Sequence, residues 1–429
     1  MAFRTSYGLW FREQPYAWLL LLFLWVFGFA GSLSRFVMAY YQAEITADLG
    51  VGRSFLGFTW STATLLGALC APLGGWLVDR IGYKKVLLIV AAANLLSVGT
   101  VLLFRSPAGF YAGIGILGGI GGLGASVTYV LVTNWFKHHR AKALTILGSA
   151  GSLGLAVLTP LLTRMQSLDW STVYLILLLN AALFLPLILF LVKPSPEGIE
   201  EEGQAGRQAS SSPAASSALS WRASLAHLRH PVVGVVMFAL LTCGFSMGTV
   251  EMHMVAIHQT AHVPEAMIAS ALSLLGLLEL VGGLTFSLLI DRMSRTRALA
   301  VLYLLRTGAF VLLWIHLPLS PLAFSLLFGA TYLGAVPGGI LVAGEALHGS
   351  GKASGLQTGL FLSIHQLGGV LAALGGGLNY DTLQDYQLLI ALNAGFSLAA
   401  AAGYAACRKS MSARQRSQAT PSPHKEGAV

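Results

Sequence analysis

Long apolar stretches follow one another along nearly the whole chain, and they leave few folds open to it. Each is about 20 residues long, which is the length of a helix that crosses the roughly 30 Å hydrocarbon core of a bilayer. The stretches are continuously apolar, without the alternation of barrel strands, and they are too long for such strands. Only 10% of the residues are charged and 55% are hydrophobic, too apolar a balance for a soluble protein. The pattern predicts an all-α membrane protein.

We predict twelve transmembrane helices, six in each half of the chain. The first six predicted cores are 17–41, 55–78, 86–104, 109–133, 142–163 and 172–192. The other six are 232–257, 267–290, 298–315, 322–346, 354–377 and 387–406.

A polar segment separates the sixth predicted helix from the seventh. It includes Glu200 to Glu202 and a run of Ser, Ala, Pro and Leu from Ser210 to Ser220, and such a composition cannot bury a core. Residues 221–230 are either an amphipathic piece on the membrane surface or a solvated tether. The expected domains are an N-terminal bundle (1–193), a cytoplasmic linker (194–230), a C-terminal bundle (231–408) and a cytoplasmic tail (409–429).

The basic residues are placed unevenly among the predicted loops, which argues for a role in topology and against nucleic-acid binding. The loops on one side contain only Arg53, Arg105 and Arg164, whereas most other Lys and Arg residues fall on the side of the two termini. By the positive-inside rule, both termini are expected to be cytoplasmic in a cell (inner or plasma) membrane.

Motifs for enzymatic or cofactor chemistry are missing from the sequence. It contains no Walker motif and no metal-ligand constellation, so we expect neither an enzyme nor a primary pump, and no cofactor or metal. Cys70, Cys243 and Cys407 lie apart in apolar helices without CxxC spacing, and they are interpreted as small core residues.

One loop sequence occurs twice. Residues 75–85 read GWLVDRIGYKK and residues 287–297 read SLLIDRMSRTR, which aligns Asp79 with Asp291 at a separation of 291 − 79 = 212 residues, close to half of 429. A repeat of this period is typical of transporters built from two related halves, whose substrate site lies between the halves near the bilayer midplane.

The first loop resembles the GxxxD(R/K)xG(R/K)(R/K) signature of the major facilitator superfamily, and the second resembles its degenerate copy. The resemblance implies two six-helix bundles that rock about a central site, and a latch between them at these loops. The latch residues that it implies are Gly75, Asp79, Arg80, Gly82, Lys84, Lys85, Asp291 and Arg292. Glu345, near the end of the tenth helix, is predicted to be a further gate or latch residue.

Several shorter patches resemble the monocarboxylate-transporter and oxalate/formate-antiporter branch of that superfamily. They lie at 28–36, 118–124, 134–143, 253–266 and 379–381. This branch would place an arginine four positions after the acidic residue of the eighth helix, but Gly283 follows Glu279 at that spacing. The resemblance to this branch therefore implies a carboxylate substrate, but the arginine that would bind the carboxylate is absent from this position.

Charged side chains inside the predicted helices are candidates for function, because burying a charge is costly. Arg35 is predicted to anchor an anion or to serve as a structural partner, and Glu251 can pair with it across the cavity. Glu279 can carry a coupling proton, since burial favours its protonated form, or it can form a fixed ion pair with Arg306.

Five uncharged or weakly basic side chains are further candidates for substrate contact. They are Tyr129, His253, Tyr332, His365 and Gln366. The alternative for each is a packing role with a hydrogen bond to a neighbouring helix, which is the more usual fate of a buried tyrosine or histidine.

The sequence as a whole predicts a monomeric secondary active transporter that moves a small organic solute by alternating access. A monocarboxylate-like organic anion, carried by symport or antiport with protons or by exchange, is the expected substrate. The alternatives are an exporter of a neutral or cationic drug-like solute, or a non-transporting membrane sensor on the same scaffold.

Overall fold

The computed structural model describes residues 13–136, 140–165, 168–193, 230–348 and 355–419. Within these ranges the chain consists of helices, turns and short irregular connections, without a strand, which confirms the all-α prediction. Among the described residues, ten helical spans are long and apolar enough to cross a membrane, one of them (Ser320–Leu347) formed by two successive helices. Two shorter apolar helices occupy the first and fourth predicted spans. Each predicted core coincides with a helix or with a short series of helices.

The described part of the first half contains five helices of 17 residues or more and several shorter ones. Its elements are α2 (Pro15–Gly31), α3 (Leu33–Tyr40), α4 (Gln42–Leu49), α5 (Arg53–Ile81), α6 (Tyr83–Leu103), α7 (Pro107–Phe110), η1 (Tyr111–Leu117), α8 (Gly118–Ile120), α9 (Leu123–Trp135), α10 (Arg140–Arg164) and α11 (Trp170–Leu191).

The second half repeats this plan with fewer interruptions. Its elements are α14 (Pro231–Thr260), α15 (Glu265–Arg292), α16 (Arg295–Ile315), α17 (Ser320–Thr331), α18 (Ala335–His348), α19 (Gly355–Leu383) and α20 (Gln387–Ala419). Helix α20 continues past Arg408, where the bundle was expected to end. The added segment has no Gly or Pro and is rich in Arg, Ala, Ser and Gln, so nothing in it stops the helix.

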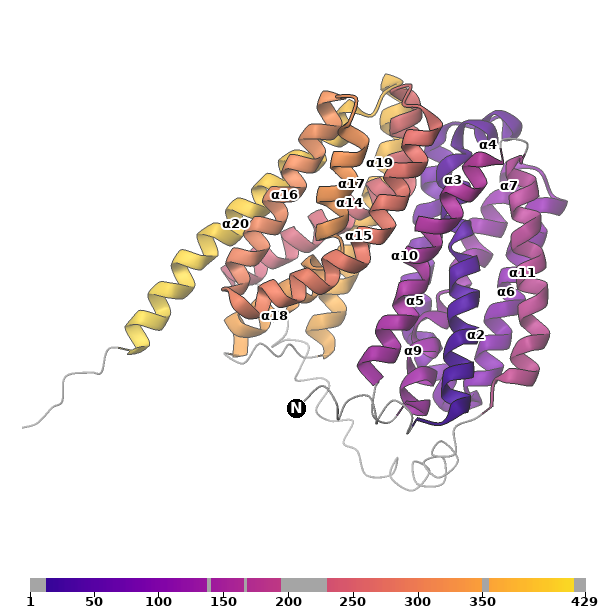
Figure 1. Ribbon diagram of the computed structural model, residues 1–429, viewed down its shortest axis with the longest axis horizontal. Coiled ribbons are helices and arrows are strands. Elements are labelled where there is room, and N and C mark those ends of the chain that lie inside the picture. Colours follow the sequence, from indigo (N-terminus) through magenta and orange to yellow (C-terminus); the bar gives the residue numbers. More distant parts are fainter. Residues whose placement is uncertain (1–12, 137–139, 166–167, 194–229, 349–354, 420–429) are drawn as a thin grey trace, which may run out of the picture.

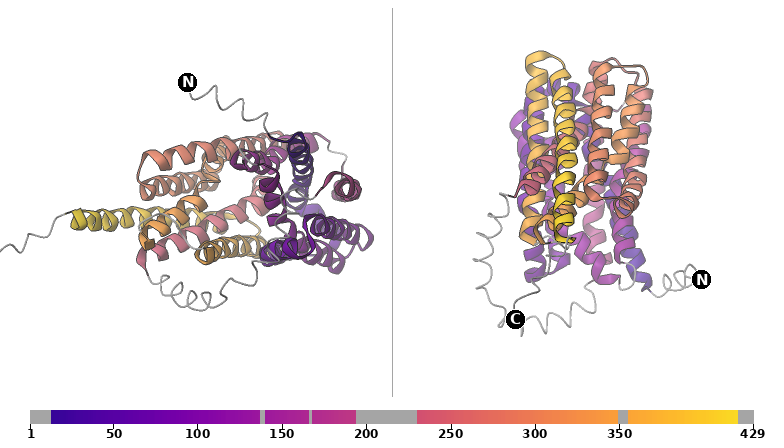
Figure 2. Two further views of the ribbon diagram at one scale, coloured as in Figure 1. Left: turned by 90° about the horizontal axis from the view of Figure 1, so that it is seen from below. Right: turned by 90° about the vertical axis from the view of Figure 1, so that its left-hand side faces the viewer.

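The two halves form two bundles that lie side by side (Figures 1 and 2). One contains α2 to α11 in indigo to magenta, and the other contains α14 to α20 in orange to yellow. We call the end of the molecule at which α2 begins and α11 ends the linker end, and the opposite end the far end. The predicted linker itself, apart from His230, lies outside the described residues.

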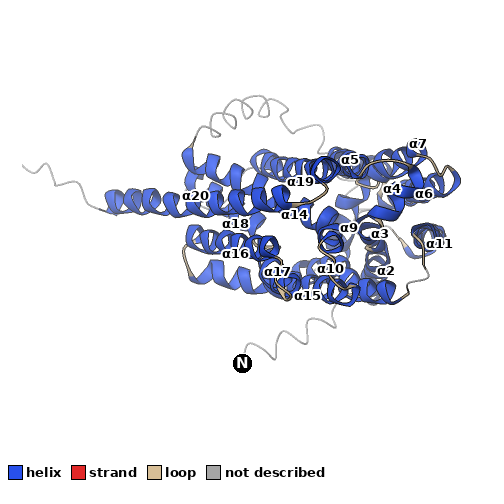
Figure 3. Cartoon of the chain, turned by 90° about the horizontal axis from the view of Figure 1, so that it is seen from above, coloured by secondary structure: helices blue, strands red, loops and turns tan. Residues whose placement is uncertain are grey.

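Two pairs of helices form the seams between the bundles. They are α5 with α19 and α10 with α15, as the view from above shows (Figure 3). Glycines allow the backbones to approach: a Cβ at Gly57 would lie 2.3 Å from the Ala373 carbonyl oxygen, and one at Gly276 would lie 2.5 Å from that of Ser152. Small residues permit such close packing in membranes, where van der Waals contact stabilises helix pairs.

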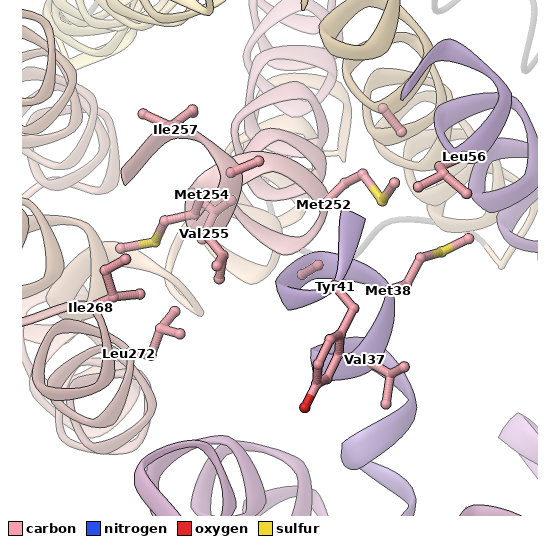
Figure 4. Close-up of a cluster of buried hydrophobic side chains, with 14 of the residues drawn as sticks. Val37, Met38, Tyr41, Leu56, Met252, Met254, Val255, Ile257, Ile268 and Leu272 are labelled. Atoms are coloured by element: carbon pink, nitrogen blue, oxygen red, sulfur yellow. The ribbon is translucent and has the colours of Figure 1, made fainter. Parts of the chain in front are cut away.

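Apolar side chains close the space between the bundles toward the far end. Met38 and Leu56 of the first bundle and Met252 and Val255 of the second belong to one buried cluster, and each is at most 3% exposed (Figure 4). Because this cluster spans both bundles, it forms an apolar seal between them.

Candidate functional site

A cavity lies at the interface of the two bundles. It is lined by Ser32 and Ala39 at α3, Gly151 and Leu155 of α10, Val250, Glu251 and Val255 of α14, and Leu272, Leu275 and Glu279 of α15. It encloses about 590 Å³ of space between protein atoms, part of which is open to solvent. An apolar wall with a few polar groups is the usual composition of a site for a small molecule.

Glu279 links the cavity to the seam between the bundles. Its side chain is only 7% exposed, and its Oε2 atom accepts a hydrogen bond of 2.7 Å from Ser152 Oγ on α10. The bond therefore joins the second bundle to the first. The sequence analysis missed Ser152, because nothing in its local sequence shows that α10 and α15 are in contact.

Glu251, on α14, lines the same cavity. Its Oε1 atom accepts a hydrogen bond of 2.7 Å from the hydroxyl of Tyr332, which is 7% exposed. Tyr332 was predicted to be a substrate-contact residue. The structure places its hydroxyl on a carboxylate of the cavity wall, and its contact with a substrate stays a prediction.

Arg306 is fully buried behind this wall. Its Nη2 atom donates to the carbonyl oxygens of Thr331 at 2.8 Å and of Tyr332 at 3.2 Å. The guanidinium therefore donates to backbone groups at the junction of α17 and α18. The reason is the helix break at that junction, which leaves carbonyl groups without helical donors. The sequence analysis had considered Glu279 as the partner of Arg306.

The two histidine candidates lie in packed helix contacts. His253 is fully buried, and its Nε2 atom lies 2.9 Å from the Ala373 carbonyl oxygen. His365 Nε2 lies 3.3 Å from Met247 Sδ. His253, His365 and Gln366 are not among the described residues that line the cavity.

The far end has a polar cluster that joins α5 to α19. Asp381 accepts hydrogen bonds of 2.9 Å from the backbone amides of both Arg53 and Ser54, so it caps the first turn of a helix in the other bundle. The Arg53 guanidinium stacks over Tyr380 at 3.6 Å and donates to the Tyr386 hydroxyl at 2.8 Å. The sequence patch 379–381 was noted only as a family resemblance.

Several latch residues lie at the linker end. Lys84 Nζ donates to the Leu189 carbonyl oxygen at 2.6 Å, and Arg80 stacks over Trp76 at 4.4 Å. Gly82 has a φ of +81°, which favours glycine at the tight turn between α5 and α6.

The corresponding region of the second bundle has an ion pair. Glu345 Oε1 lies 2.7 Å from Arg295 Nη1, and Arg292 is exposed. The pair holds the end of α18 against the start of α16. The side chains of Arg35, Gly75, Asp79, Tyr129 and Asp291 lie outside the described residues, so their predicted roles remain predictions.

Comparison with known proteins identifies the family. The sequence pattern of the Major Facilitator Superfamily matches residues 20–373. The chain is 28% identical over 397 residues to the Bacillus subtilis (strain 168) protein "Uncharacterized MFS-type transporter YcxA", covering 87% of this chain and 91% of the relative. It is also 33% identical over 153 residues to the D-galactonate transporter of Escherichia coli O6:H1 (strain CFT073), covering 34% of each.

Solved structures support the same fold. The nucleoside transporter NupG (D323A mutant) superimposes with a TM-score of 0.71 at 15% identity, covering 90% of this chain and 99% of that one. A D-xylose-proton symporter gives a TM-score of 0.65 at 15% identity, covering 91% and 97%. The fold, the matched pattern and the named relatives agree: this chain is a multi-pass membrane transporter that belongs to the major facilitator superfamily.

Proposed function

We propose that this chain is a proton-coupled secondary transporter of a small organic anion of the monocarboxylate type. The observation that carries the proposal is the position of Glu279, a buried carboxylate that lines the cavity and accepts a hydrogen bond from the other bundle. A proton on Glu279 changes both the charge of the cavity and the bond across the seam. Protonation and the relative movement of the bundles are therefore coupled at one atom.

The anionic substrate is supported by the sequence. Arg35 belongs to α3, and Ser32 and Ala39 on either side of it line the cavity. An arginine in this stretch supplies the donors that a carboxylate needs. The partial similarity to a D-galactonate transporter points the same way, because galactonate is a carboxylate.

The direction of access follows from the seal at the far end. The apolar cluster and the Asp381 cap both lie there, so the cavity would communicate with the linker end in this state. The basic residues around Lys84 and Arg295 support a cytoplasmic position for the linker end by the positive-inside rule. We therefore place both termini in the cytoplasm of a cell membrane, with the structure in an inward-facing state.

Reconstitution into proteoliposomes tests the proposal. Purified protein is assayed for counterflow and for gradient-driven uptake of D-galactonate and small monocarboxylates, with a pH dye in the lumen. We expect an inward proton gradient to drive accumulation. In E279Q we expect counterflow to persist and proton-driven accumulation to be lost, because the neutral amide keeps the size of the side chain but cannot release a proton.

Two controls make the result interpretable. S152A removes the hydrogen bond across the seam but keeps the carboxylate, so it should weaken the coupling of proton flux to transport without abolishing it, whereas R35A should abolish anion transport. Proton-driven accumulation by E279Q at the wild-type rate would contradict the assignment of Glu279, and full transport by R35A would remove the anion anchor.

A second candidate function is export of a cationic or neutral drug-like solute. The described cavity wall favours it in one respect, since it combines two carboxylates, Glu251 and Glu279, with apolar side chains such as Leu155 and Leu272. Lipophilic cations in the same counterflow assay distinguish the two functions. Exchange of any solute also excludes a non-transporting sensor.

A further inference from the structure

We propose that Arg306 is a positioning residue for the cavity: it holds the break between α17 and α18 and thereby places the Tyr332 hydroxyl on Glu251. The hydrogen bonds themselves are features of the structure. Their effect on transport rests on the function proposed above.

The tenth span is interrupted at a defined place. Helix α17 ends at Thr331 and α18 begins at Ala335, and Tyr332 to Gly334 form a turn. Pro337, in the first turn of α18, has no amide hydrogen to donate toward the preceding turn. The carbonyls of Thr331 and Tyr332 lie at the end of α17, where the last carbonyls of a helix have no donor within that helix.

Arg306 supplies those donors from α16. One nitrogen, Nη2, bridges the Thr331 and Tyr332 carbonyls, and Nε lies 3.4 Å from Thr331 Oγ1. The guanidinium also lies 5.1 Å from the ring centre of Phe328 and 5.6 Å from that of Tyr303. A break within a membrane span is tolerated when a neighbouring helix satisfies the freed groups, as this arginine does.

The backbone held by Arg306 carries the side chain that reaches the cavity. The same residue, Tyr332, accepts from Arg306 through its carbonyl and donates to Glu251 Oε1 at 2.7 Å through its hydroxyl. Arg306 thus acts on the cavity without lining it. Moving the carbonyl by a fraction of an ångström would misdirect the hydroxyl, because a hydrogen bond weakens steeply with poor geometry.

The first bundle has a related arrangement at the equivalent position. The repeat offset of 212 relates Arg306 to Asn94 of α6, since 306 − 94 = 212. The fourth span is also broken, at Gly121 and Gly122, and Asn94 Oδ1 lies 3.1 Å from where a Cβ of Gly121 would be. In both bundles, therefore, a polar side chain of the third span lies beside a break in the fourth span. In the first bundle this side chain is the amide of Asn94, and in the second it is the cationic guanidinium of Arg306.

The test is chemical modification of Glu251 in the full chain in lipid nanodiscs, without a substrate. Dicyclohexylcarbodiimide modifies protonated carboxyl groups in apolar surroundings, and mass spectrometry of the Glu251 peptide, with the Glu279 peptide as internal reference, gives the rate. We expect Y332F to raise modification of Glu251 by roughly tenfold, because the carboxylate loses a hydrogen bond. R306Q should raise it by roughly threefold or more for the same reason.

Further variants separate positioning from general destabilisation. The double variant R306Q/Y332F should react no faster than Y332F alone, because both changes act through one hydroxyl. R306K should lie between wild type and R306Q, and R297Q, which removes an exposed charge from the same helix, should match wild type.

Wild-type modification of Glu251 in a folded R306Q protein, or additive effects in the double variant, would overturn the proposal. If R306Q does not fold, R306K is compared with wild type instead, and a wild-type rate of Glu251 modification in R306K would equally overturn the proposal. Because no substrate is used, failure of this test is distinct from failure of proton-coupled transport, which is measured separately in proteoliposomes.

Discussion

At the scale of single residues, polar groups in this chain satisfy backbone atoms of other helices. Arg306 serves two carbonyls, His253 contacts a third, and Asp381 serves two amides. In a bilayer such groups have no water to bond to, so each freed backbone atom requires a partner from the protein. This requirement explains why His253, a candidate substrate ligand, contacts a backbone carbonyl.

Asp169 also bonds to a backbone amide, but at the start of α11 and outside the membrane. It caps α11, because its Oδ1 atom accepts from the Thr172 amide at 3.1 Å, and hydrogen bonds from the Ser171 and Thr172 side chains lower the pKa of its carboxyl below the ordinary value. D169A should lower the free energy of unfolding by about 1 kcal/mol at neutral pH, whereas D169N should keep most of the cap. Thermal unfolding of detergent-purified protein measures both.

The pH dependence of this cap has a definite sign. Because the pKa of Asp169 is lower in the folded state, its ionised form contributes stability above the ordinary pKa of an aspartate, and that contribution is lost as the pH falls through the lowered value. The advantage of wild type over D169A should therefore persist at mildly acidic pH. An advantage that vanishes above pH 5 would contradict the assignment.

At the scale of helices, glycines decide where two backbones can meet. A Cβ at Gly377 of α19 would lie 2.6 Å from Ser54 Cα of α5, a contact that no side-chain movement relieves. Gly375 of the same helix has open space at the corresponding position. Two glycines only two positions apart thus have different roles, and the sequence alone does not distinguish them.

The pair G377A and G375A tests the seam. G377A should force α19 away from α5 and lower the unfolding temperature, while G375A should be neutral or stabilising by about 0.5–1 kcal/mol through helix propensity. Thermal unfolding in matched detergent compares them. Equal stability of the two variants would show that the seam does not depend on backbone approach at Gly377.

At the scale of the whole molecule, the two bundles meet at the far end through a mixed apolar and polar surface. The cluster of Figure 4 supplies the apolar part, and Asp381 with Arg53 supplies the polar part. In the alternating-access cycle that we propose, this surface separates when the linker end closes. Its stability therefore sets the balance between the two states.

Removing the cap at Asp381 should shift that balance. D381A exposes two amides at the start of α5 in the closed state, and a capping contribution of about 1–2 kcal/mol corresponds to roughly a tenfold change in population. Spin labels at A47C and L383C, in a variant without Cys70, Cys243 and Cys407, would report longer far-end distances by electron paramagnetic resonance. An unchanged distance distribution would contradict a role for Asp381 in closure.

The order of the helices and the repeat of two halves could be predicted from the sequence, because hydrophobic length and a repeated loop are local properties of the chain. Twelve predicted cores correspond to helices, and the offset between Asp79 and Asp291 also relates Asn94 to Arg306. The partners of the acidic side chains could not be predicted. Ser152 with Glu279, Tyr332 with Glu251 and Asp381 with the start of α5 are separated by 81 to 328 positions. Only the packing of helices brings these atoms together, because a side chain in a bilayer bonds to whichever group the neighbouring helix presents.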